Sequence, residues 1–93
     1  MGRRTVGVCM SVRKMALREI ERMERVFSQI EVIADTDVFS LAESYFSDSK
    51  FFFERGEYLN AFEAVVIAWA YIDSLLHFSK VKIPDELKDL FTV

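Results

Sequence analysis

The sequence predicts an all-α fold, a three-helix bundle built on an antiparallel helical hairpin, with a short C-terminal helix. Two long segments carry apolar residues at helical spacing, and Gly56 separates the second from a third segment that is apolar nearly all round. The single proline, Pro84, precedes a short amphipathic stretch. Ninety-three residues make one domain, expected over residues 11–93, and residues 1–10 show no period and are expected to form a flexible tail.

The first helix is expected from about Ser11 to Ile33. Ser11 fits the N-cap position, where its hydroxyl can accept from a free backbone N–H of the first turn. Apolar residues follow one another at spacings of four and three, which places them on one face. They are Ala16, Ile20, Met23, Phe27 and Ile30. Residues 34–37 form a short polar break before the next helix.

The second helix is expected from about Val38 to Arg55, and Gly56 ends it, because glycine suits the left-handed position just past a helix. The third helix restarts at Glu57 or Tyr58 and continues to about Phe78. So short a connection makes the two helices antiparallel neighbours. A helix that is apolar nearly all round is expected to be buried on most sides, between the first two helices.

Residues 79–82 are expected to form a loop. Pro84 suits the first position of a final helix that ends near Phe91, because its missing N–H would be unsatisfied there in any case. The apolar side chains of this helix would pack back on the bundle. They are Leu87, Leu90 and Phe91.

Composition limits the possible functions. One cysteine, Cys9, excludes an internal disulfide, and one Cys with one His cannot form a structural zinc site, which needs about four N or S ligands. We therefore expect no metal, no cofactor and a cytoplasmic protein. No secretory signal is visible, and the longest apolar run, residues 64–72, is short against the about 20 residues of a membrane span.

The stretch around Gly56 resembles an archaeal family, the domain of unknown function 357. The family pattern has Tyr, Asp and an aromatic before a helix end, then Gly, an acidic residue, Tyr and a small residue, and later aromatic-apolar-Asp. In this chain the pattern falls on Tyr45, Asp48, Phe52, Gly56, Glu57, Tyr58, Ala61 and Tyr71-Ile72-Asp73. The resemblance covers about residues 38–80 and implies a small archaeal helical bundle with no assigned activity.

Asp73 and His77 share one helix face and are candidates for a site that holds a metal or a general base. The competing interpretation is a helix end, where the dipole favours a cationic His77. The register of the hairpin places Asp48 too far along the axis to share an ion with Asp73. We expect Asp73 to bond Ser44 or Tyr45, and His77 to meet Asp37.

The helix pair also resembles the HEPN class, whose ribonucleases carry an Arg a few residues before the catalytic His. No Arg lies between Arg55 and His77, so that motif is absent. Trp69 with Tyr45, Phe52, Phe62 and Tyr71 could line a pocket, although aromatics at helical spacing are typical of a core.

Basic residues gather near the N-terminus, with seven basic and three acidic residues in 1–25. Arg18, Arg22 and Arg25, extended by Lys14, could form a phosphate-binding stripe. The interleaved acidic residues weaken it, and Glu19 with Arg22 and Glu21 with Arg25 are spaced for ion pairs.

We predict a non-enzymatic protein-association module that forms a homodimer or binds another protein. The alternative is a nucleic-acid-associated accessory domain that uses the basic face of the first helix. An enzyme around Asp48, Asp73 and His77 is the third interpretation.

Overall fold

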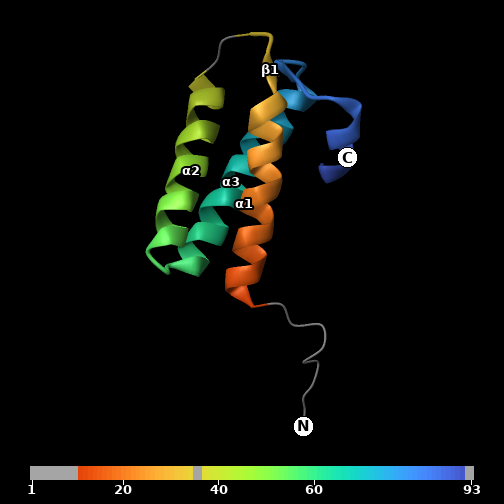
Figure 1. The fold of residues 1–93 in the computed structure, drawn as a ribbon. Helices are drawn as coiled ribbons and strands as arrows, with labels where there is room; N and C mark the ends of the chain where they lie inside the picture. Colours follow the sequence, from red (N-terminus) through yellow and green to blue (C-terminus); the bar gives the residue numbers. More distant parts are fainter. Residues whose placement is uncertain (1–10, 35–36, 92–93) are drawn as a thin grey trace.

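The protein is a bundle of three α-helices (Figure 1). The structure is a computed structural model, and it describes residues 11–34 and 37–91. The helices are α1 (Val12–Gln29), α2 (Asp37–Glu54) and α3 (Tyr58–His77). The all-α bundle and its antiparallel hairpin are therefore confirmed, whereas the predicted tail, with Cys9, lies outside the described residues.

Helix α1 begins as predicted, with the Ser11 hydroxyl accepting from the Lys14 amide at 3.1 Å. Its buried residues are Ala16, Ile20, Met23 and Val26. The helix ends at Gln29, so its predicted extension to Ile33 was wrong. Glu31–Val32 instead form β1, which pairs antiparallel with β2 (Val81–Lys82).

Two physical reasons explain this early end. The β-branched residues Ile30, Val32 and Ile33 favour extended backbone over a helix. The chain segment that follows α3 also supplies hydrogen-bond partners, since the amides of Ile33 and Ala34 donate to the Lys80 carbonyl at 2.9 and 3.2 Å. The predicted loop over residues 79–82 accordingly contains a short strand.

Helices α2 and α3 turn about Gly56, as predicted. Gly56 has φ +80°, and the amides of Gly56 and Glu57 donate to the carbonyls of Phe53 and Phe52 at 3.0 and 2.9 Å. These two bonds form a Schellman motif, which satisfies carbonyls at the end of α2. Small residues line the contact between the two helices and allow their backbones to approach. They are Ala42, Ser49, Ala61, Ala64 and Ala68.

The end of α3 repeats this motif with a different residue. Ser79 has φ +58°, and the amides of Ser79 and Lys80 donate to the carbonyls of Leu76 and Leu75 at 3.1 and 2.8 Å. A left-handed conformation strains a residue that carries a Cβ. Ser79 therefore occupies a position that glycine would suit better.

Helix α3 contacts both α1 and α2 and is the central helix, as predicted. It is less buried than predicted, because Leu59, Val66 and Ile67 are 58%, 44% and 38% exposed. Among the described residues it has the length and mean hydropathy (1.4) of a membrane span, a property shared by core helices of soluble bundles. Its packing between α1 and α2 favours the role of a bundle core.

The C-terminal segment packs on the side of the bundle away from α2 (Figure 1). The expected short C-terminal helix is η2 (Asp85–Leu90), a 3₁₀-helix, and Pro84 is its N-cap residue and not its first helical residue. Leu87 and Phe91 are buried and Leu90 is half-buried, so the predicted packing against the bundle is confirmed.

The two Schellman motifs predict opposite effects of substitution. Gly56→Ala should lower the free energy of unfolding by about 1 kcal/mol, because an added Cβ meets no atom within 4 Å and only the backbone conformation is strained. Ser79→Gly should raise it by about 1 kcal/mol. Urea unfolding measures both, with Gly56→Asn as the milder control. If Gly56→Ala and Ser79→Gly destabilised the protein equally, the assignment of left-handed positions to both residues would be contradicted.

Candidate functional site

An exposed face runs along the whole of α3. The α3 outer face, which borders Glu19 and Arg22 of α1 at Val66 and Ala70, is defined as the exposed residues at helical spacing along α3. They are Leu59, Glu63, Val66, Ile67, Ala70, Ser74 and His77. A face with exposed apolar side chains in a small protein marks an interaction surface.

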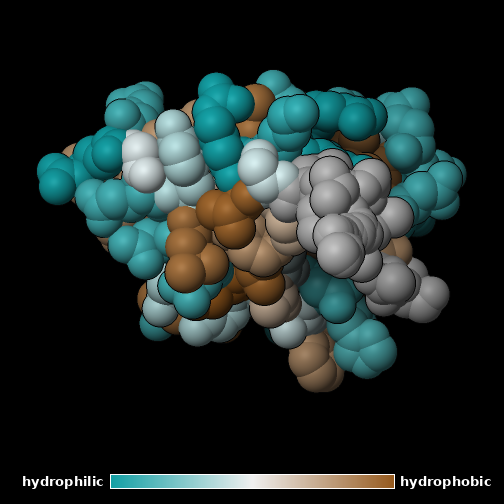
Figure 2. All heavy atoms as spheres, turned by 90° about the horizontal axis from the view of Figure 1, so that it is seen from below, coloured by the Kyte–Doolittle hydropathy of each residue, from teal (hydrophilic) through white to brown (hydrophobic). Residues whose placement is uncertain are grey.

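The apolar character continues at the end of the bundle that carries the α2–α3 turn. Figure 2 views this end and shows hydrophobic side chains gathered near its middle, framed by hydrophilic ones. By their places in the helices, Phe51 near the end of α2 and Leu59 near the start of α3 belong to this end, and they are 57% and 58% exposed. The end of the bundle where the α3 outer face begins therefore carries an exposed aromatic side chain as well.

A hollow of about 570 Å³ lies between the end of α3 and the C-terminal segment. Its lining combines an apolar floor with charged groups and brings Asp73 and His77 together, as the helix spacing predicted. The lining includes Asp73, Leu76, His77, Lys82, Asp85 and Lys88. We call it the Asp73–His77 hollow.

The charges of this hollow are mixed. Lys88 forms an ion pair with Asp85 at 2.9 Å, and its hydrogen bond and positive charge lower the pKa of Asp85. Asp85 is therefore ionised at neutral pH. With Lys82 and Asp73 also present, the hollow has neither a clearly anionic nor a clearly cationic character.

A second hollow, of about 440 Å³, borders Asp73 on the side of α1. We call it the Trp69 groove; it is lined by Glu19, Arg22, Val66, Trp69, Ala70 and Asp73, with Leu90 and Phe91. The Trp69 ring meets the Phe91 ring edge-on, with centroids 4.6 Å apart. The groove contains none of the aromatics expected beside Trp69, which were Tyr45, Phe52, Phe62 and Tyr71. Phe91 of the C-terminal segment supplies the neighbouring ring instead.

Two polar atoms beside this groove lack partners. Within the described part of the chain, Trp69 Nε1 and Asp73 Oδ1 are buried and make no hydrogen bond. An unpaired buried donor or acceptor destabilises the fold by roughly 1–3 kcal/mol. The C-terminal segment covers α3 here without satisfying either group.

The direction of Asp73 corrects the sequence-based expectation. We expected Asp73 to bond Ser44 or Tyr45 of α2, yet neither hollow beside it contains an α2 residue. Tyr71 is the residue that faces α2, since its ring lies 5.8 Å from that of Tyr45. Two residues further along a helix is about 200° around it, so Asp73 faces the opposite side.

The predicted contact between His77 and Asp37 is also missing. Both residues belong to the described ranges, and no hydrogen bond or ion pair joins them; the His77 ring instead meets Phe78 edge-on at 5.3 Å. Asp48 is exposed on α2 and does not border either hollow, so the structure does not bring it to Asp73. The three carboxylate and imidazole candidates therefore reduce to one pair, Asp73 and His77.

The residues of the family pattern near the turn have structural roles. Tyr58 packs edge-on against Phe53 at 5.1 Å, and the Arg13 guanidinium lies over both rings at 5.5 and 5.9 Å. Arg55 forms an ion pair with Glu57 at 2.7 Å. Hydrogen bonds from Arg55 and then Asn60 lower the pKa of Glu57.

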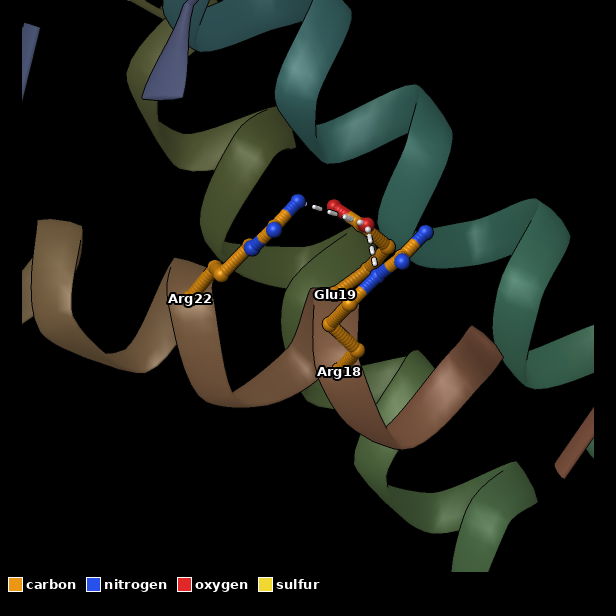
Figure 3. Close-up of polar contacts among 3 residues, drawn as sticks. All are labelled: Arg18, Glu19 and Arg22. Carbon is orange, nitrogen blue, oxygen red and sulfur yellow. Dashed lines mark hydrogen bonds and ion pairs between the residues drawn. The ribbon is translucent and has the colours of Figure 1, made fainter. Parts of the chain in front are cut away.

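Two of the four basic residues expected on one face of α1 share a single carboxylate. Figure 3 shows Arg18 and Arg22 both contacting Glu19, each at 3.2 Å. The side chain of Glu19 is only 15% exposed, so it holds the two arginines against the bundle. The predicted pair of Glu19 and Arg22 is thus confirmed, whereas Glu21 and Arg25, both described, form none.

No group of three or more His, Cys, Asp or Glu side chains gathers into a potential metal site in residues 11–34 and 37–91. The Asp73–His77 hollow offers two such groups and Asp85, which is committed to Lys88.

Fold and surface together define a small helical bundle whose central helix keeps one face exposed. The chain belongs to the family of proteins of unknown function DUF357, whose family model matches residues 11–80. It is similar to protein AF1782 from Archaeoglobus fulgidus, a DUF357 protein of known crystal structure. The two are 36% identical with a TM-score of 0.70, over 78% of this chain and 93% of that one. No curated protein matches the chain.

The family match ends at residue 80, so most of the segment that covers Asp73 and Trp69 lies beyond it. Sequence reasoning missed the contribution of Phe91 and Lys82 to the hollows. It also missed the exposure of Leu59, Val66 and Ile67, although an all-round apolar helix with only two neighbours leaves such a face.

Because Phe91 contacts Trp69, the only tryptophan, Trp69 fluorescence reports on the packing of the C-terminal segment. Phe91→Ala should lower the free energy of unfolding by about 3 kcal/mol and shift Trp69 fluorescence to longer wavelength, because the indole gains water. Acrylamide quenching of Trp69 should also increase. Lys88→Ala, which removes only an exposed ion pair of η2, is the control and should leave both unchanged. Unchanged fluorescence in Phe91→Ala would contradict the contact.

Proposed function

We propose that this protein is a protein-association module that pairs with a second copy of itself through the α3 outer face. The observation that carries the proposal is the exposure of Leu59, Val66 and Ile67 on one side of the central helix. Their spacing of seven and eight residues keeps them on one stripe two turns long.

The arrangement of the helices supports another helix as the partner that covers the α3 outer face. Helices α1 and α2 contact α3 on two sides and the C-terminal segment borders it on a third. A second α3 on the remaining side would bury exposed apolar side chains of both copies at once, since a two-fold interface uses the same surface twice. Helical bundles are commonly completed in this way.

The electrostatics support protein rather than nucleic acid as the partner. Nucleic-acid binding requires basic side chains that are free to neutralise phosphates. Arg18 and Arg22 share Glu19, Lys50 pairs with Glu24 at 3.5 Å, and the whole chain has a net charge of −3. These pairs disfavour the nucleic-acid alternative.

Ile67→Lys tests the proposal. A charge within the stripe should weaken self-association at least about tenfold, because the lysine would be desolvated in the interface. Sedimentation or light scattering across micromolar concentrations measures it. Ser47→Lys adds the same charge on the exposed side of α2 and should leave association unchanged. A monomeric wild-type protein at all concentrations, or RNA binding that weakens steeply with salt, would overturn the proposal.

A second candidate function is small-molecule binding or catalysis in the Asp73–His77 hollow. The specific observation is that Asp73 and His77, four residues apart on α3, border one hollow of about 570 Å³. A carboxylate beside an imidazole can orient it as a general base. The unpaired Asp73 Oδ1 adds to the case, because groups that destabilise the fold are often kept for a function.

Asp73→Leu separates a functional from a structural Asp73. If the carboxylate is not needed for folding, the leucine removes an unpaired buried oxygen and should raise the free energy of unfolding by about 1 kcal/mol. Asp73→Asn keeps the shape and a polar group, and should change it less. Chemical denaturation measures both. Destabilisation by leucine would assign Asp73 to the fold and remove the reason for the second candidate.

A further inference from the structure

On the α3 outer face, a glutamate and a histidine lie at equal distances on either side of Ala70. Ala70, a small and exposed residue, lies seven residues after Glu63 and seven residues before His77, and all three are exposed on this face. Seven residues are about two helical turns, or roughly 10 Å. An acidic side chain and an imidazole are therefore placed symmetrically about Ala70.

This pattern distinguishes the two ways in which two α3 helices can pair. In a parallel pair each residue meets its own copy, so Glu63 would face Glu63 and His77 would face His77. In an antiparallel pair centred on Ala70, Glu63 of each copy meets His77 of the other. Like charges across an interface are unfavourable, whereas a carboxylate accepts a hydrogen bond from an imidazole N–H.

The side chains around the centre suit a close crossing. Ala70 offers only a methyl group where the two helices would meet, and the distance between packed helices depends on the side chains at that point. Val66 and Ile67 lie one turn away and would be covered from both copies. In this pairing Val66 lies opposite Ser74 and Ile67 opposite Asp73 of the other copy, whereas Leu59 lies beyond the end of the other α3.

We infer that two copies of this chain pair antiparallel along α3, with a two-fold axis passing near Ala70 and with Glu63 of each copy beside His77 of the other. The inference rests on the proposed self-association and adds its geometry and its specific polar contacts.

Cysteine cross-linking of the full-length chain tests the geometry. Cys9→Ser first removes the only native thiol. In that background Ala70→Cys should form a disulfide-linked dimer under mild oxidation, because a residue on the two-fold axis meets its own copy within disulfide range. Glu63→Cys alone is the matched control and should cross-link at least about tenfold more slowly, since only the antiparallel arrangement separates its two copies.

A mixture of Glu63→Cys and His77→Cys chains should cross-link to each other, at a rate comparable with that of Ala70→Cys alone. Light scattering of the same samples before oxidation reports association independently. If the chains associate but Glu63→Cys cross-links rapidly to itself, the antiparallel geometry is overturned and self-association stands. The same conclusion follows if the chains associate but Ala70→Cys does not cross-link. Monomers throughout would overturn both.

Discussion

The left-handed turn at Gly56 is the constraint on which the rest of this bundle depends. It ends α2 with a Schellman motif and restarts the chain as α3 within a few residues, so that the two helices must lie side by side. The small residues Ala42 and Ser49 of α2 then meet Ala61, Ala64 and Ala68 of α3, and close packing follows from their size. Because α1 joins this pair from one side only, the central helix has more apolar surface than its neighbours cover.

The ends of α1 and α3 are joined by a second, smaller constraint. The strands β1 and β2 pair Val32 with Val81, and this pairing turns the chain after α3 toward α1. Ile83, Leu87 and Phe91 are then buried against the side of α3 that faces away from α2. The position of Ser79 in a left-handed conformation makes this change of direction possible without a glycine. The two hollows exist because a short 3₁₀-helix covers this side less completely than a full helix would.

Sequence reasoning predicted what depends on local pattern and missed what depends on distant partners. The three helices and the Gly56 turn follow from periodicity and from one residue with special backbone freedom. The strand at Glu31–Val32 depends on residues about fifty positions later, which no local signal identifies. Asp73 shows a different failure, because the hairpin register locates a residue along the axis but not around it. With Tyr71 facing Tyr45, rotation alone sends Asp73 to the other side.

Four departures from ordinary packing lie close together on α3. Val66 and Ile67 are apolar and exposed, whereas Trp69 Nε1 and Asp73 Oδ1 are polar, buried and unpaired, and all four residues lie within two turns of Ala70. Ser49, a buried polar residue of α2, is by contrast paired, because it donates to the Phe46 carbonyl at 2.6 Å. A sequence selected only for stability would have polar residues at positions 66 and 67 and fully apolar residues at positions 69 and 73. Because all four lie on one helix, beside the surface proposed to pair with a second copy, they support the proposal that this part of α3 is maintained for binding.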